Sequence, residues 1–136
     1  MRFELTPKEF RRLLDLVYIG NWVLNSTRGN DRFQDYDDVE SKLFGLCRGG
    51  GMSVLVEQRG GVCVPSQAYV DGGIHEAIAC YEDNVFFELL AEELSRRDMN
   101  YPDITDDNYE EMIRRIGEYM EEFEVSGVDH LILDNE

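Results

Sequence analysis

Residues 6–25 read TPKEFRRLLDLVYIGNWVLN. Thr6 and Glu9 have the spacing of a capping box, in which each side chain accepts a hydrogen bond from the backbone amide of the other. Pro7 suits the first turn of a helix because proline lacks an amide hydrogen. The residues that follow are apolar on nearly every side of a helix, which is typical of a central, buried helix. We therefore expect a helix-rich fold organised around this segment.

Further helices and a small β element are expected along the rest of the chain. A helix is predicted over 35–47, ending before three glycines at 49–51. Strands are predicted at 53–56 and 62–64, because the pair Gly60-Gly61 between β-branched runs is typical of a hairpin turn. A helix from 74 to 98 is expected to break near 82–84. The last helix is predicted to start near 105–107 and to end at Ser126, and residues 128–133 are compatible with a short C-terminal strand.

These elements predict a mainly α (α+β) fold. Four to five helices are expected around a single core, with a small β-hairpin, and residues 1–136 are expected to form one helical domain with an acidic C-terminal half. Hydrophobic residues make up 43% of the 136 residues, so the chain has enough apolar side chains for one core.

The three cysteines, Cys47, Cys63 and Cys80, are far apart and odd in number. This pattern is typical of reduced thiols in a cytoplasmic protein. No apolar run approaches the roughly 20 residues that cross a bilayer, and the N-terminus lacks the features of a signal peptide. The chain therefore resembles a bacterial cytoplasmic protein, and its negative charge argues against direct binding to nucleic acid or anionic membranes.

No motif predicts a cofactor, a metal site or a catalytic residue. His75-Glu76 begins like the zinc motif H-E-x-x-H, but Ala79 stands where the second histidine is required. The acidic residues near Asp103 lack the glycine and the final glutamate of a calcium loop. We therefore expect no catalytic residue, no bound metal and no cofactor.

The charge is distributed very unevenly. The chain has 29 acidic and 13 basic residues, a formal net charge of −16. The first 70 residues hold 9 of each sign, whereas the rest hold 20 acidic and 4 basic residues. On the predicted helix ending at residue 98, Glu92–Arg96 and Glu93–Arg97 have the favourable i,i+4 order, so local pairing explains its charge.

The first half of the last helix has the same i,i+4 Glu–Arg spacing, but its second half has no such pairs. Glu110–Arg114 and Glu111–Arg115 are expected to pair. In the second half, carboxylates crowd the C-terminal turns, where each opposes the helix dipole at a cost of about 0.3–1 kcal/mol. No base follows within those turns, and a broken local rule without compensation is where function is expected.

We therefore expect a non-catalytic binding protein whose acidic C-terminal helix engages a basic partner protein. Eight carboxylates over about 28 Å approach the phosphate spacing of a nucleic-acid strand, so one version is a nucleic-acid mimic that inhibits a DNA- or RNA-binding protein, in the manner of anti-restriction or anti-CRISPR proteins. Two alternatives stay open: a small cytosolic enzyme that uses His75, and a generic soluble helical protein. The predicted contact residues are Glu110, Glu111, Glu118, Glu121, Glu122 and Glu124.

Three stretches resemble a family of small acidic bacterial proteins. They are residues 5–22, LTPKEFRRLLDLVYIGNW; residues 86–94, FFELLAEEL; and residues 122–127, EFEVSG. The resemblance covers both ends and the middle helix, about half of the chain, and it does not include the glycine-rich hairpin. It implies an α-rich fold and no particular activity or site.

Overall fold

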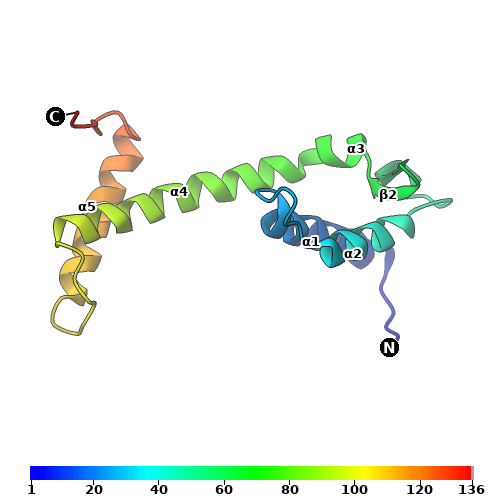
Figure 1. The fold of residues 1–136 in the computed structure, drawn as a ribbon, viewed down its shortest axis with the longest axis horizontal. Helices are drawn as coiled ribbons and strands as arrows, with labels where there is room; N and C mark the ends of the chain where they lie inside the picture. Colours follow the sequence, from blue (N-terminus) through cyan, green and yellow to red (C-terminus); the bar gives the residue numbers. More distant parts are fainter. Residues whose placement is uncertain (136) are drawn as a thin grey trace. The chain divides into compact units, whose positions relative to one another are not determined.

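The computed structural model describes residues 1–135 and is mainly helical (Figure 1). The mainly α fold with a small antiparallel hairpin is therefore confirmed. The chain divides into two compact units, Met1–Ile78 and Ala79–Glu136, which we describe separately. One domain over 1–136 stays a prediction. The elements in chain order are α1 (Pro7–Asn25), α2 (Gln34–Gly45), η1 (Ser53–Leu55), β1 (Val56–Arg59), β2 (Val62–Pro65), α3 (Gln67–Tyr69), η2 (Val70–Ile74), α4 (His75–Asp98) and α5 (Tyr109–Ser126).

Helix α1 starts with the predicted capping box. The amide of Thr6 donates to Glu9 Oε2 at 2.9 Å, and the amide of Glu9 donates to Thr6 Oγ1 at 3.2 Å. The prediction that α1 is buried on nearly all sides is wrong, since Leu16 is 69% exposed and Val23 is 61% exposed. Only the side that includes Leu14 meets the core of the first unit, so the apolar residues on the other sides face solvent.

The core of the first unit is built from Leu14, Phe44, Cys47 and Tyr69, all buried. The ring of Tyr69 lies edge-on to Phe44, with centroids 5.0 Å apart. Its hydroxyl donates to Asp15 at 2.8 Å, and burial is the main cause that raises the pKa of Tyr69. The ring of Tyr69 thus fills the core, while its hydroxyl forms a hydrogen bond at the edge of the core.

The hairpin forms with Gly60 and Gly61 at its turn, as predicted. Both glycines have positive φ, +56° and +78°, which the tight turn requires. The first strand begins at Val56, so the predicted strand over 53–56 is mostly wrong. Residues 53–55 form the 3-10 turn η1, and the hydroxyl of Ser66 donates to the carbonyl of Val54 at 2.5 Å.

Helix α4 runs without the break predicted at 82–84. No glycine or proline lies between His75 and Asp98, and the polar residues at 82–84 are exposed, so nothing opposes a continuous helix. The interruption comes earlier, in η2, where Gly73 adopts φ +107°. A residue with a side chain is strained in that conformation, so glycine explains the kink.

The second unit consists of the rest of α4, the loop 99–108, α5 and the segment after it. No strand forms at 128–133, so that prediction is wrong: residues 127–130 are turns and 131–135 are irregular. A strand needs a neighbour for its backbone groups, and in residues 1–135 β1 and β2 pair only with each other. No helix in this described part of the chain has the length and apolar character that a bilayer crossing requires.

Candidate functional site

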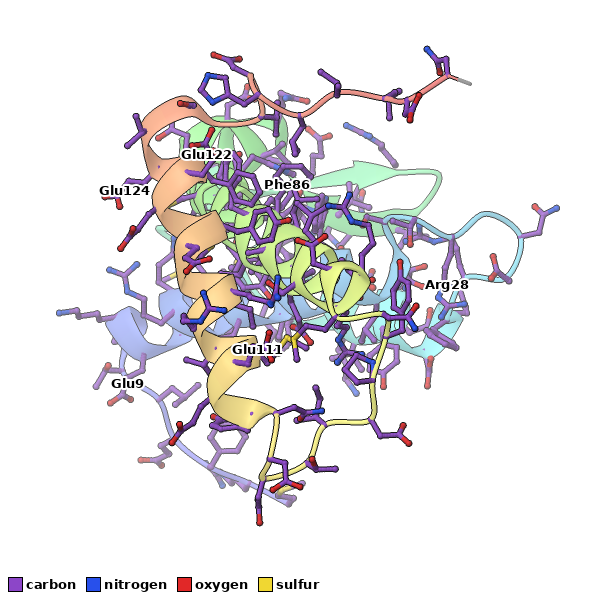
Figure 2. All side chains as sticks on the ribbon, turned by 90° about the vertical axis from the view of Figure 1, so that its left-hand side faces the viewer. Glu9, Arg28, Phe86, Glu111, Glu122 and Glu124 are labelled. Carbon is purple, nitrogen blue, oxygen red and sulfur yellow. The ribbon has the colours of Figure 1, made fainter. Side chains whose placement is uncertain are left out.

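The second unit carries most of the negative charge. Ala79–Glu136 contains 18 acidic and 4 basic residues, against 11 and 9 in Met1–Ile78. The corresponding formal charges are −14 and −2. Figure 2 shows Glu111 near one end of α5 and both Glu122 and Glu124 near the other end. A basic partner would therefore be attracted to this unit much more strongly than to the first.

A groove of about 360 Å³ lies between α4 and α5 within this unit. Its floor is apolar and consists of Phe87, Met120 and Phe123. Carboxylates line its rim, supplied by Glu88 from α4 and by Glu121 and Glu124 from α5. A groove with an apolar floor and negatively charged borders thus lies in the most acidic part of the chain.

The helical spacing of the sequence explains this arrangement. On α4, Asn84, Phe87 and Glu88 stand at positions i, i+3 and i+4, which share one face of a helix. On α5, Met120, Phe123 and Glu124 repeat the same spacing. Each helix therefore presents an aromatic ring with a carboxylate one residue further along the chain.

Aromatic packing holds the two helices together at the groove. The rings of Phe87 and Phe123 have centroids 5.4 Å apart, and Tyr119 stacks on Phe123 at 6.0 Å. Phe123 is only 5% exposed. The floor of the groove is therefore also the contact that joins α4 to α5.

A second contact joins the end of α4 to α5 through polar groups. The hydroxyl of Tyr119 donates to Asp98, and Arg97 pairs with the same carboxylate at 2.9 Å. The hydrogen bond from Tyr119 and then that from Arg97 lower the pKa of Asp98, and the bond to Asp98 raises the pKa of Tyr119. Arg97 thus pairs with Asp98 and not with Glu93 as predicted, whereas Arg96 does pair with Glu92 at 2.9 Å.

Three of the six predicted contact glutamates have internal partners. Glu111 pairs with Arg115 at 2.9 Å, as predicted. Arg114 pairs with Glu118 at 2.5 Å, so the predicted Glu110–Arg114 pair is wrong. The preference for a glutamate before its arginine is worth only a few tenths of a kcal/mol, too little to fix the choice between two glutamates each four residues away.

Glu122 has a partner that the sequence did not reveal. The chain turns after α5, and His130 Nδ1 is hydrogen-bonded to Glu122. The expectation that the C-terminal carboxylates lack all compensation is therefore wrong for this residue. The histidine is 70% exposed, so the pair stabilises the fold only slightly.

Glu110, Glu121 and Glu124 have no ion-pair partner among residues 1–135. Two of these three, Glu121 and Glu124, line the groove, whereas Glu110 does not. The structure thus gathers only part of the predicted set at one site. It adds Glu88, which sequence reasoning missed because the facing of α4 toward α5 is a long-range property.

The residues of the enzyme alternative are dispersed. His75 Nε2 is hydrogen-bonded to the hydroxyl of Tyr18 at 2.6 Å and lies edge-on to the ring of Trp22. Cys47 is buried, which raises the pKa of its thiol, and Cys80 is exposed. Within residues 1–135, no cysteine or carboxylate is hydrogen-bonded to His75, and no three His, Cys, Asp or Glu side chains gather as metal ligands would.

A polar network that the sequence analysis did not identify lies between α1 and α2. Asn21 Nδ2 donates to Asp37 at 3.0 Å and to Glu40 at 3.1 Å. Arg32 forms two hydrogen bonds to Asp37, at 2.8 and 3.0 Å, and lowers its pKa. Burial raises the pKa of Glu40, because its charge is removed from water without an ionic partner of its own.

Replacement of Glu40 by glutamine is expected to stabilise the protein at neutral pH. The folded pKa of Glu40 lies above its unfolded value, so folding of the wild type becomes less favourable as the pH rises from the unfolded pKa through the folded pKa. Glutamine keeps an oxygen for Asn21 and has no charge to bury. The melting temperature of Glu40→Gln should exceed that of the wild type at neutral pH, and the gap should narrow as the pH falls from neutral to about 5, toward the unfolded pKa.

Asp38→Asn is the matched control, since Asp38 is exposed on the same helix and its side chain accepts a hydrogen bond from the exposed Gln34. Its melting temperature should follow the wild type across the same range. The measurements stay above the pI of about 4.3 to avoid precipitation. A Glu40→Gln protein that melts below the wild type at neutral pH would contradict the assigned cost of burial.

Comparisons with known proteins assign no family to this chain. No protein-family model matches the sequence, and neither the curated proteins nor the solved structures provide a significant match. The resemblance to small acidic bacterial proteins therefore stays a prediction.

Proposed function

We propose that this protein is a non-catalytic binding protein whose acidic second unit engages a basic partner protein. The observation that supports this best is the groove between α4 and α5, with an apolar floor and, on its rim, carboxylates that form no ion pair within residues 1–135. A helix with one apolar face and lysines or arginines beside it has the complementary pattern. Its apolar side chains would cover Phe87, Met120 and Phe123, while its cations would meet Glu88, Glu121 and Glu124.

Charge complementarity also argues against a second copy of this chain as the occupant. The second unit carries 18 acidic residues and 4 basic ones, so two such units would repel each other. A basic partner instead gains from the same field, which speeds association and makes it sensitive to salt.

Nucleic-acid mimicry is the alternative form of the same proposal. It would use the whole length of α5 as a row of negative charges. That row is interrupted, because Arg114 pairs with Glu118 and Arg115 pairs with Glu111. An apolar groove floor is also foreign to a phosphate backbone, so an amphipathic helix of a partner protein suits this surface better.

The test is a titration of a fluorescently labelled amphipathic Lys/Leu helix with the full chain, followed by fluorescence anisotropy. The triple variant Glu88→Gln, Glu121→Gln, Glu124→Gln should bind at least about 30-fold more weakly, equivalent to about 2 kcal/mol. A scrambled peptide of the same composition should bind less tightly than the amphipathic one, because it cannot place its leucines on one face.

The matched control is Glu93→Gln, Asp107→Asn, Glu110→Gln. These three residues are exposed, lie in the same unit and do not line the groove. Both triple variants change the net charge equally, so a nonspecific electrostatic effect would weaken binding to the same extent in both. Equal weakening, or a wild type that prefers neither peptide, would overturn the groove as the docking site. A wild type that instead displaces duplex DNA from a basic DNA-binding protein, unaffected by the groove variant, would support the mimic.

A further inference from the structure

A separate pocket of about 300 Å³ lies between α1 and α2 in the first unit. This volume is at the small end of the range for ligand pockets, which is about 300–1,000 Å³. It is therefore large enough for a small molecule. Its lining residues include Tyr18, Asn21, Trp22, Asn25, Arg32 and Glu40.

The charges in this pocket do not cancel. The guanidinium of Arg32 is committed to Asp37 by hydrogen bonds at 2.8 and 3.0 Å, and it also donates to the carbonyl of Asn25 at 3.3 Å. Glu40 accepts one hydrogen bond, from Asn21, and has no ion-pair partner among residues 1–135. One partly buried negative charge is thus left over, and its burial raises the pKa of Glu40.

The asparagine amides of the pocket have no donor to spare, whereas Glu40 can accept a further hydrogen bond. Both hydrogens of the Asn21 amide are used, one on Asp37 and one on Glu40. Both hydrogens of the Asn25 amide are used as well, on Asn21 and on the carbonyl of Phe33. The second carboxylate oxygen of Glu40 still has acceptor capacity. A ligand that donates hydrogen bonds and carries positive charge would complement these groups.

Two aromatic rings complete the lining. Trp22 and Tyr18 lie on the same side of α1, four residues apart, and both line the pocket. His75 orients them: it hydrogen-bonds the Tyr18 hydroxyl at 2.6 Å, and its ring lies edge-on to Trp22 at 6.1 Å. The faces of tryptophan and tyrosine attract cations, and they also cover apolar groups.

We propose that this pocket binds a small organic cation bearing a primary ammonium group, with Glu40 as its ion-pair partner and Trp22 and Tyr18 against its apolar part. This site is independent of the groove in the second unit. The ammonium would donate to the second oxygen of Glu40 and would neutralise the excess charge. Arg32 would stay paired with Asp37, so no competing cation would need to move.

Trp22 is the one tryptophan of the chain, so its fluorescence reports directly on the pocket. The probe is n-butylammonium chloride, with n-butanol as a neutral ligand of similar shape and sodium chloride as a control for ionic strength. We expect a saturable change of Trp22 emission with n-butylammonium that n-butanol and sodium chloride do not produce. Side-chain amide signals of Asn21 and Asn25 in nuclear magnetic resonance spectra provide a second measurement that does not depend on quenching.

Glu40→Gln should weaken n-butylammonium binding at least about tenfold, whereas Asp38→Asn should leave it unchanged. Because Glu40→Gln is expected to be more stable than the wild type, its loss of binding would not reflect unfolding. Equal responses to n-butylammonium and n-butanol would overturn the cation site, as would unchanged affinity in Glu40→Gln. A response to n-butylammonium in neither measurement up to about 0.1 M would overturn it too, because that limit corresponds to less than about 1.5 kcal/mol of binding.

Discussion

Phe123→Ala is expected to lower the free energy of unfolding of the second unit by about 3–5 kcal/mol. Phe123 is 5% exposed and packs between Phe87 and Tyr119, so alanine removes the contact that joins α5 to α4. Two helices have few other buried groups with which to fill the resulting cavity. Urea unfolding followed by far-ultraviolet circular dichroism measures the loss, since both helices contribute to that signal.

Val125→Ala is the control for this substitution. Val125 lies on the same helix but is 86% exposed, so its removal should change the stability by no more than about 0.5 kcal/mol. A similar small change in Phe123→Ala would contradict its place in the packing between α4 and α5.

The same variant tests whether the chain unfolds as one domain. Trp22 lies in the first unit, so its fluorescence follows that unit, while circular dichroism follows the helices of both. A single domain over 1–136, as the sequence predicts, requires both signals to shift together in Phe123→Ala. A shift of the circular dichroism transition alone would show that the two units unfold independently.

Local rules of the sequence predicted the local structure well. The capping box of Thr6 and Glu9 forms as expected, because its groups are only three residues apart and need no tertiary contact. The turn at Gly60 and Gly61 forms for a similar reason: glycine accepts positive φ at little cost. The existence of the long helices also followed from the apolar periodicity of the chain.

Burial was predicted less well, because an apolar pattern does not show which side of a helix packs against another element. Leu16 and Val23 are aliphatic like Leu14, yet of these three only Leu14 belongs to the buried core of the first unit. Likewise, residues 128–133 have a strand-like composition but pair with no strand in the described part of the chain: 128–130 form turns and 131–133 are irregular. Such outcomes depend on packing between segments that are distant in sequence.

The candidate sites show the same contrast between local patterns, which the sequence reveals, and long-range packing, which it does not. The excess of carboxylates after residue 70 drew attention to α5, but the lining of the proposed groove also includes Glu88 and Phe87 from α4. The partner of Glu122 is His130, eight residues away and beyond the helix end, where the i,i+4 rule does not apply. Charge patterns therefore indicate an acidic helix, whereas the shape of the groove depends on the packing of two helices.

Asn25→Leu is expected to destabilise the first unit by about 2–4 kcal/mol, because the amide of Phe33 and Oδ1 of Asn21 lose their hydrogen bonds to Asn25. Asn25 is 1% exposed, and its side chain satisfies both backbone groups of Phe33: it accepts from the amide at 2.8 Å and donates to the carbonyl at 3.1 Å. It also donates to Asn21 at 2.7 Å. Leucine has a similar shape but no hydrogen-bonding groups, so it fills the site without replacing these bonds.

The position of Asn25 explains why the effect should be large for a single amide. It is the last residue of α1, and Phe33 directly precedes α2, so one side chain fixes the loop that joins the two helices. The network then continues through Asn21 to Glu40, so Asn25→Leu should also weaken the orientation of the pocket beside Trp22. Asn30→Leu, at an exposed position of the same loop, is the control and should change the stability by no more than about 0.5 kcal/mol. Urea unfolding followed by Trp22 fluorescence compares the two variants; equal midpoints would show that the amide of Asn25 does not hold α1 and α2 together.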